Sequence, residues 1–216
     1  MSITNFRALK LKHKLIAEDA TENFNVRIHR ALKWLERSEK ENGDHDAEFI
    51  FLWISFNAAY AQLFGYEHSE KENFNQFFTL IIEMDQKNHI HNLLFENFSG
   101  HIRTLIENKF IYEQFWRALR DQEISTQWKD SFELSKKKAL SSLLEKDTLT
   151  TLSIVFSRLY VLRNQLIHGG STWNSQVNRQ QVMDGCKILR QLIPVVLALM
   201  VENFQEDYGE LIYPLV

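Results

Sequence analysis

The chain has 216 residues, of which 44% are hydrophobic, including 16 Phe, but it contains only seven Gly and two Pro. So few turn-forming residues exclude a sandwich or barrel with many tight connections and favour an all-α protein of long helices. The formal net charge of −3 excludes a strongly basic nucleic-acid coat, so any binding of RNA would depend on a local patch.

Cys186 is the only cysteine of the sequence, which excludes an intrachain disulfide and a thiolate-based zinc site. The first residues contain no apolar run of the kind found in signal peptides. The longest apolar run, residues 193–201, is shorter than the about 20 residues that cross a membrane. We therefore expect a cytoplasmic protein that does not associate with membranes.

Two helices are predicted in the first third of the chain. Residues 21–41 place apolar side chains on one helical face, and Gly43 follows as a natural stop. Residues 46–64 carry apolar side chains on two faces, so this helix should be buried on all sides before it ends at Gly65. The apolar positions are Phe24, Ile28, Ala31 and Leu35 in the first helix, and Phe49, Leu52, Trp53, Phe56, Tyr60 and Leu63, with Ile50, Ile54 and Ala61 opposite, in the second.

The middle of the chain predicts several further helices. A Ser-x-x-Glu capping box at residues 69–72 should begin a third helix. Residues 85–120 indicate short helices with a break near Ser99–Gly100, and residues 127–146 predict a longer helix.

Two helices, about residues 148–167 and 178–205, close the chain, and Asp147 or the next residue can cap the first of them. Neither a linker nor an internal repeat interrupts the sequence. We therefore predict an all-α protein with a single helical domain over residues 1–216.

The helix of residues 148–167 has a charged residue on its apolar side. The main apolar stripe consists of Leu149, Leu152, Phe156, Leu159 and Leu166. At about 100° per residue, Arg163 lies in the middle of this stripe. A guanidinium is costly to bury unless it is paired or lines a cavity, so Arg163 needs a partner. A thinner apolar seam on the opposite side, where a packed partner helix would lie, consists of Ile154, Val161 and His168.

Three polar side chains near the end of this helix could form a site. Asn164 and His168 are four residues apart and share a helical face. Arg163 and His168 are about 140° apart and cannot reach one small group from a regular helix. Gly169–Gly170 would let the helix end at His168 and free the imidazole. Alternatively, a second copy across a two-fold axis would complete the site.

These residues resemble a known motif. An Arg, a polar residue, three more residues and then a His at the end of a helix is the signature of HEPN domains, which occur in many prokaryotic defence and toxin ribonucleases; Arg163, Asn164 and His168 match it. The run FIFLWISFNAAY, residues 49–60, is similar to the second helix of the Apea-like HEPN branch, and Gly169–Gly170 fits that branch too. The resemblance covers two helices. It implies a HEPN-like bundle, an up-and-down four-helix core with additional helices, in a homodimer.

What the resemblance implies is a metal-independent endoribonuclease of the antiphage-defence or toxin type, without a cofactor. In this family two motifs meet at the dimer interface, and the ribose 2′-hydroxyl attacks the adjacent phosphate. His168 would be the general base or acid, since an imidazole titrates near neutral pH. Arg163 would bind the phosphate and stabilise its developing charge. Asn164 and Asn57 would position the imidazole or the substrate. The implied partners are RNA, a second copy, and an antitoxin or defence-system protein.

Each of these residues also has a structural interpretation. Arg163 could pair with a buried carboxylate or with Asn57, and His168 could lie favourably at the negative end of the helix dipole. Asn57, on an otherwise apolar helix, could make a core hydrogen bond. The chain could then be a non-catalytic HEPN-like helical module that binds RNA, a nucleotide or a protein partner, or the structural partner of a nucleotidyltransferase antitoxin.

Other chemically capable residues favour structural roles. Cys186 lies on the regular apolar stripe of the last helix and should be a buried, unreactive thiol. His89 and His91 resemble half of a metal site, but two histidines alone do not complete one, so we expect no metal. Lys136–Lys138 is expected to be a solvated face, with an RNA-guiding patch as the alternative.

Overall fold

All of the regular structure is helical in the computed structural model, which describes residues 6–41, 43–60, 70–122 and 126–213. Its α-helices are α1 (Phe6–Ile16), α2 (Glu22–Ser38), α3 (His45–Tyr60), α4 (Glu70–Met84), α5 (His89–Asn92), α6 (Ser99–Glu107), α7 (Glu113–Arg120), α8 (Gln127–Glu145), α9 (Thr148–Ile167) and α10 (Arg179–Glu202). A π-helical turn (Leu93–Asn97) precedes α6 and a 3-10 helix (Lys109–Ile111) follows it. The predicted all-α class is confirmed, and no helix among the described residues has the length and apolar composition to cross a membrane.

The predicted helices agree closely with the observed ones. The bounds predicted for α2, α8, α9 and α10 are confirmed to within three residues at each end. The break predicted near Ser99–Gly100 is where α6 begins. Gly65, the predicted end of α3, and Ser69, the first residue of the predicted capping box, lie outside the described residues.

Two helices begin at a side chain that caps the first turn. Thr21 Oγ1 accepts a hydrogen bond from the Phe24 amide at 3.2 Å. Asp147 Oδ1 accepts one from the Thr150 amide at 3.0 Å, so Asp147 is the cap of α9. This bond holds the pKa of Asp147 below its ordinary value. Each such cap stabilises its helix by about 1 kcal/mol.

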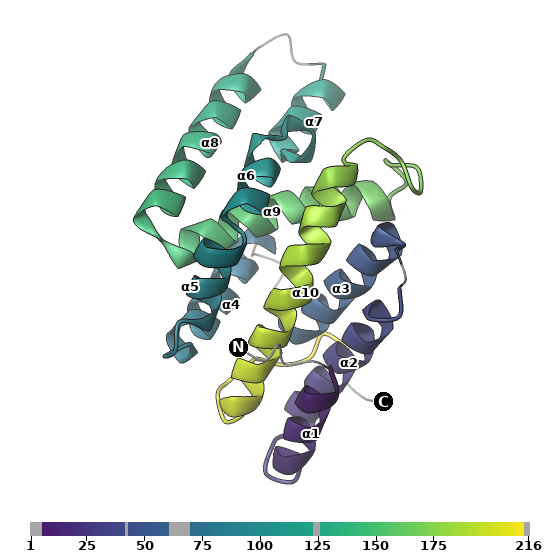
Figure 1. Cartoon of the computed structure of the whole chain (residues 1–216), viewed down its shortest axis with the longest axis vertical. Helices are drawn as coiled ribbons and strands as arrows, with labels where there is room; N and C mark the ends of the chain where they lie inside the picture. Colours follow the sequence, from purple (N-terminus) through teal and green to yellow (C-terminus); the bar gives the residue numbers. More distant parts are fainter. Residues whose placement is uncertain (1–5, 42, 61–69, 123–125, 214–216) are drawn as a thin grey trace.

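The long helix α9 crosses behind α6 and α10 and connects the two sides of the bundle (Figure 1). On one side, α2 lies along α3, α3 packs against α10, and α1 contacts both α2 and α10. On the other side, α4 packs on α9, and α8 contacts both α7 and α9. Helix α9 is therefore covered by neighbours from several directions. Which of its side chains are buried depends on which neighbouring helix packs over each face.

The centre of the core is an aromatic cluster around Trp53, which is fully buried. The ring centroid of Trp53 lies 6.1 Å from that of Phe156 and 6.3 Å from that of Tyr160, both on α9. The Phe56 and Phe156 centroids are 4.5 Å apart. Aromatic pairs at such distances contribute about 0.5–1.5 kcal/mol each beyond the area they bury. These rings fix α9 against α3.

Helix α10 approaches α3 and α9 closely at Gly185. A Cβ added there would lie 2.7 Å from Phe49 Cε2 and 3.0 Å from Leu159 Cδ2, so a side chain at this position would force the core apart. Ile50 and Ile54, on another face of α3, are only half-buried. The prediction that this helix is buried on all sides is wrong, because its packing against α2, α9 and α10 leaves that face partly open.

Candidate functional site

Helix α9 ends where the motif ends. Its last helical residue is Ile167, and the next residue, His168, donates its backbone N–H to the carbonyl of Asn164 at 3.0 Å. Gly169 follows with φ of +69°, a conformation that glycine adopts without strain. The predicted end of the helix at His168 is thereby confirmed, and the side chain of His168 is exposed to solvent.

Arg163 and Asn164 are joined by a hydrogen bond inside the motif. Nη1 of Arg163 donates to Oδ1 of Asn164 at 2.8 Å, and the guanidinium carbon lies 5.9 Å from the ring centroid of Tyr160. Within the described part of the chain, no carboxylate pairs with Arg163 and its Nε has no hydrogen-bond partner. Arg163 is therefore half-buried but keeps donors that could bind a phosphate.

Arg163 and His168 do not contact each other in one chain, as far as the described residues show. The helix is regular up to Ile167, so the two side chains lie on different sides of it. Arg163 lies half-buried beside Tyr160, whereas His168 lies in solvent. Helical periodicity predicts that the two positions are about 140° apart, and the different surroundings of the two side chains agree with this. A site that uses both groups on one phosphate therefore needs a second copy of the chain or a movement of the helix end.

Asn57 is half-buried on α3 and has no described contact with Arg163. Its neighbour Phe56 packs on Phe156, which precedes Arg163 by seven residues, or about 10 Å of helical rise. Oδ1 of Asn57 is buried and has no hydrogen-bond partner among the described residues. The structure thus leaves Asn57 apart from the motif, with an unused acceptor of its own.

The loop after His168 is held to the start of α3 by Asp46. Oδ2 of Asp46 accepts a hydrogen bond from the Asn174 amide at 2.7 Å. The two carboxylate oxygens also accept from the guanidinium of Arg179, at 2.9 and 3.1 Å. Sequence reasoning missed this anchor because 133 residues separate Asp46 from Arg179, and the only local signal is an acidic residue in the first turn of a helix.

Large apolar side chains are exposed on both sides of His168 in the sequence. Ile167 is 45% exposed, Trp173 71% and Val177 64%. The indole N–H of Trp173 donates to Asp44 at 3.0 Å, which holds the ring in this exposed position. Exposed apolar side chains that gather in one segment can mark a contact surface, and these three belong to residues 167–177. We call these three side chains the apolar rim.

The seam predicted to meet a partner helix is covered within the chain itself. Val161 is buried, and Ile154 lines the same cavity as Leu134 of α8. Helix α8 is therefore the neighbour of this part of the seam. Of the three seam residues only His168 is exposed, so a second copy would have to approach at the end of α9 rather than along its length.

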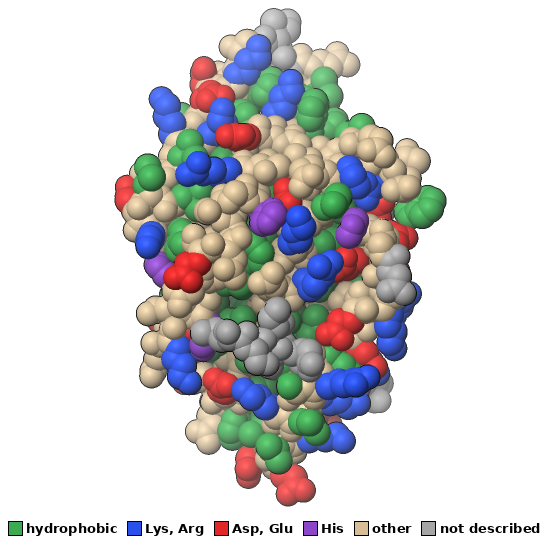
Figure 2. Space-filling view, viewed as in Figure 1, with side chains coloured by type: hydrophobic (Ala, Val, Ile, Leu, Met, Phe, Trp, Pro, Cys, Tyr) green, Lys and Arg blue, Asp and Glu red, His purple; other side chains and the backbone are tan. Residues whose placement is uncertain are grey.

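Lys, Arg and His side chains gather over the upper part of α10, as Figure 2 shows for one face of the molecule. Several of them are paired with buried carboxylates. Nε of Arg190 donates to Glu48 at 2.7 Å, and Nδ1 of His101 lies 2.8 Å from Oδ1 of Asp184. Glu48 and Asp184 are both buried. Because these acids neutralise their basic neighbours, this face is poorly suited to bind a phosphate backbone.

His45, Glu48 and Cys186 are the described residues whose potential ligand atoms come within 4.8 Å of one another. Burial raises the pKa of the Cys186 thiol above its ordinary value, and its sulfur donates to the carbonyl of His45 at 3.3 Å. Glu48 is already paired with a basic side chain. A protonated thiol and a neutralised carboxylate are poor metal ligands. Among the residues that the structure describes, His91 belongs to no such group, and its Nδ1 lies 2.9 Å from Thr148 Oγ1.

No family model, curated protein or solved structure matches this chain. The case for its function therefore depends on the geometry at the end of α9. There an exposed imidazole follows a half-buried arginine with unused donors, beside an exposed apolar rim.

Proposed function

We propose that the protein is a metal-independent endoribonuclease of the antiphage-defence or toxin type, with an active site formed where two copies bring the ends of their α9 helices together. The observation that carries the proposal is that the C-terminal part of one helix holds Arg163, whose guanidinium has no carboxylate partner among the described residues, and that the helix is followed directly by the exposed His168. RNA cleavage needs a proton carrier and a phosphate ligand, which these two side chains can supply. The resemblance to HEPN domains points to the same residues.

The need for a second copy follows from the positions of the two side chains. His168 is exposed and Arg163 is half-buried on a different side of the helix, so one chain offers them to different groups. A two-fold contact through the apolar rim would bury Ile167 and Trp173 and bring a second motif to the first. The rim supports this arrangement because exposed apolar area gains free energy when it is covered.

In the proposed reaction, His168 of one copy removes the proton from a ribose 2′-hydroxyl. The 2′-oxygen then bonds to the adjacent phosphorus, the bond from phosphorus to the 5′-oxygen breaks, and a water molecule returns a proton to that oxygen. The products are a 2′,3′-cyclic phosphate and a 5′-hydroxyl. Arg163 binds the phosphate oxygens, with Asn164 fixing the guanidinium through their hydrogen bond.

A non-catalytic helical module that binds RNA, a nucleotide or a protein partner is the second candidate. It is favoured by one observation, the lack of a described contact between Arg163 and His168 within the chain. A binding module needs the arginine but no proton carrier. Loss of His168 would then leave its affinity for the ligand unchanged.

The test is incubation of purified wild-type protein, Arg163→Ala and His168→Ala with mixed RNAs in EDTA. We expect cleavage by the wild type with 2′,3′-cyclic phosphate ends. We expect His168→Ala to be slower by about 10²-fold or more, since general acid–base catalysis contributes about 10²–10⁴-fold. His29→Ala is the matched control, because His29 is exposed on α2, far from the motif in the sequence.

Intact RNA at high concentrations of the wild-type protein would contradict the nuclease proposal and leave the binding module. If both motif variants cut as fast as the wild type, the site is elsewhere. Cleavage by the wild type separates the two candidates, and binding of a fluorescent RNA by all four proteins then shows whether His168→Ala loses activity while keeping its affinity, as the nuclease proposal expects.

A further inference from the structure

Arg158, on α9, is buried more deeply than the arginine that the motif contains. It is 2% exposed, and among the described residues its guanidinium donates one hydrogen bond, from Nη2 to Ser135 Oγ at 3.0 Å. Its Nε is buried without a partner, and no carboxylate of the described chain pairs with it. The guanidinium carbon lies 4.3 Å from the ring centroid of Tyr112 and 5.4 Å from that of Phe132. A buried cation is thus left with aromatic rings and one hydroxyl.

A second buried arginine of the same chain has hydrogen-bond acceptors for its guanidinium. Arg27 is 1% exposed and donates to the carbonyls of Ala59, Gly209 and Glu210, at 3.0, 2.9 and 3.5 Å. Burial lowers the pKa of both Arg27 and Arg158 to about 10, so both stay charged at neutral pH. The backbone provides acceptors for Arg27 and does not do so for Arg158. An acceptor for Arg158 has to come from elsewhere.

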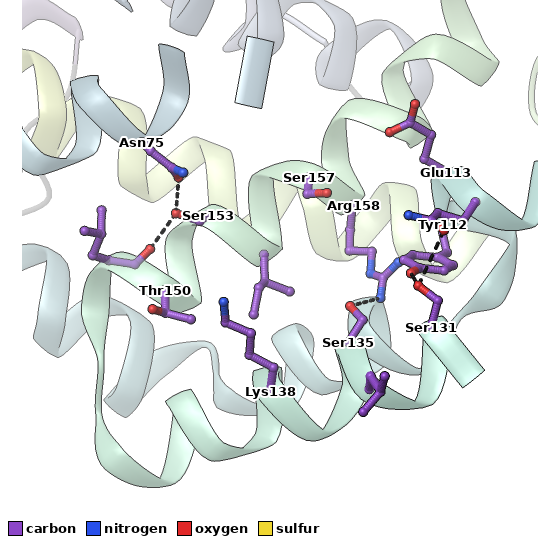
Figure 3. Close-up of a pocket in the computed structure, with 14 residues that line it drawn as sticks. Asn75, Tyr112, Glu113, Ser131, Ser135, Lys138, Thr150, Ser153, Ser157 and Arg158 are labelled. Atoms are coloured by element: carbon purple, nitrogen blue, oxygen red, sulfur yellow. Dashed lines mark hydrogen bonds between the residues drawn. The ribbon is translucent and has the colours of Figure 1, made fainter. Parts of the chain in front are cut away.

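Arg158 lines a cavity of about 500 Å³ between α8, α9 and the start of α7 (Figure 3). This volume lies in the range of small-molecule sites, about 300–1,000 Å³. Lys138 reaches into the same cavity from α8. The polar lining also includes the amides of Asn75 and Gln114 and six hydroxyl groups, those of Tyr112, Ser131, Ser135, Thr150, Ser153 and Ser157.

The charge of the cavity favours an anion. Arg158 and Lys138 are its two cations, and Glu113 is the one carboxylate among its lining residues. The carboxylate of Glu113 points away from the guanidinium in Figure 3 and forms no ion pair with it. Ser157 makes no described side-chain hydrogen bond, so its hydroxyl is available as a donor beside Arg158. Forked guanidinium, ammonium and hydroxyl donors together suit a tetrahedral oxyanion.

We propose that this cavity binds a small phosphate monoester, with Arg158 and Lys138 holding the phosphate and the hydroxyl groups of Ser135 and Ser157 completing its hydrogen bonds. A phosphate monoester carries a charge of about −1.5 to −2 near pH 7, which matches two cations, whereas a single carboxylate would leave one cation unbalanced. The remaining volume accommodates an organic group of the size of a sugar.

The phosphate site is separate from the proposed nuclease site. Arg158 and Arg163 are five residues apart on α9, which places them about 140° apart around the helix. The cavity is lined by α8 and α9, whereas the motif lies at the exposed end of α9. Ligand binding can therefore be measured in His168→Ala, and it does not depend on whether the chain cleaves RNA.

The test is isothermal titration of the full chain with ribose 5-phosphate, inorganic phosphate and succinate. We expect both phosphates to bind, and we expect succinate to bind at least about tenfold more weakly, because its two charges lie on separate planar carboxylates rather than on one tetrahedral group. Lys138→Gln should weaken the binding of ribose 5-phosphate about tenfold, because it removes a charge-assisted hydrogen bond to the phosphate. Lys137→Gln is the matched control, because Lys137 is exposed, adjacent in the sequence and outside the cavity lining.

Arg158→Lys keeps the charge but loses the fork, and we expect it to weaken ribose 5-phosphate about tenfold as well. Should this variant fold poorly, Lys138→Gln and Ser157→Ala still decide the matter, because both sites are at the cavity wall rather than in the core. Absence of binding by either phosphate would overturn the proposal, and so would equal affinity in the wild type and Lys138→Gln. Tighter binding of succinate than of phosphate would overturn the choice of ligand.

Discussion

Asp46 accepts two hydrogen bonds from the guanidinium of Arg179, at 2.9 and 3.1 Å, and so joins the start of α3 to the start of α10. The same carboxylate accepts the amide of Asn174 from the loop between them. His168 lies at the other end of this loop, directly after α9. One partly buried carboxylate therefore positions the segment that carries the exposed imidazole.

Asp46→Asn should lower the free energy of unfolding by about 3 kcal/mol, because breaking a buried ion pair leaves Arg179 without its counter-charge. The side chains are 10% and 18% exposed, so solvent screens the pair only in part. Urea unfolding measures the loss. Asp130→Asn, an exposed acid on α8, is the control and should change stability by less than about 0.5 kcal/mol.

The same variant should also loosen the loop of residues 169–178. Hydrogen exchange of the loop amides should be faster in Asp46→Asn than in the wild type, with the exchange of α9 itself little changed. If the loop amides exchange at the wild-type rate, Asp46 contributes to stability without positioning the motif.

Mixing two inactive variants tests whether the proposed nuclease site is shared between copies. Arg163→Ala and His168→Ala should each be nearly inactive alone. If one site takes its arginine from one copy and its histidine from the other, a mixed dimer holds one intact site and one doubly damaged site. We expect the mixture to recover a sizeable part of the wild-type cleavage rate, measured after the dimers have exchanged subunits.

Failure of the mixture to recover activity would place both groups of a site on the same chain, or would require both imidazoles. A failure to dimerise is tested separately, by comparing the sedimentation of the wild type and of Trp173→Ser. Since Trp173 is part of the apolar rim, its loss should shift the protein toward the monomer.

The cap of α9 predicts a defined dependence of stability on pH. The Thr150 amide donates to Asp147 and lowers the pKa of its carboxyl in the folded chain. A group with a lowered folded pKa contributes stability above its unfolded pKa, about 3.9, and loses it as the pH falls through the folded pKa. Asp147→Ala should therefore cost about 1 kcal/mol at pH 7 and less below about pH 4.

Urea unfolding of the wild type and Asp147→Ala at pH 7 and pH 3 checks this expectation. The difference between the two proteins should shrink at the lower pH, where the carboxyl takes up its proton. A difference that stays constant over this range would mean that the charge of Asp147 does not contribute to the cap.

The two buried arginines should respond differently to the same substitution. Arg27→Met should lower the free energy of unfolding by about 3 kcal/mol, because three carbonyls lose a charged donor. Arg158→Met should change it by less than about 1 kcal/mol without ligand. Removal of an unpaired buried charge offsets the loss of a cation–π contact of about 1–2 kcal/mol. Thermal or urea unfolding in phosphate-free buffer measures both.

If Arg158→Met is as destabilising as Arg27→Met, the aromatic contacts of Arg158 with Tyr112 and Phe132 are sufficient to explain its burial. The evidence for the phosphate site would then come from the isothermal titrations alone.

The helices themselves could be predicted because their causes are local. The spacing of apolar residues predicted the extent of α9. Asp147 predicted where the helix begins, and the glycines after His168 predicted where it ends. Helical periodicity also predicts that Arg163 and His168 point to different sides, and the structure places His168 just beyond the end of the helix. HEPN-like activity of these residues stays a prediction.

Burial on α9 could not be predicted from one helix. Periodicity marked Arg163 as the buried charge, yet Arg163 is half-buried and Arg158 is 2% exposed. The reason is that an apolar stripe identifies one covered face, whereas α9 has neighbours on several sides. The rings of Tyr112 and Phe132, which cover Arg158, belong to segments earlier in the chain.

By itself, the sequence determined the all-α class, the start and end of the motif helix, and the residue types available for chemistry, because these depend on near neighbours in the chain. Only the tertiary structure decided which charges are paired. Asp46 meets Arg179 across 133 residues, whereas Arg158 meets no carboxylate among the described residues. Whether a charge is neutralised or left available to a ligand depends on the packing between helices that are distant in the sequence. That packing pairs Asp46 with Arg179 and leaves Arg158 in its cavity without a carboxylate partner in the described part of the chain.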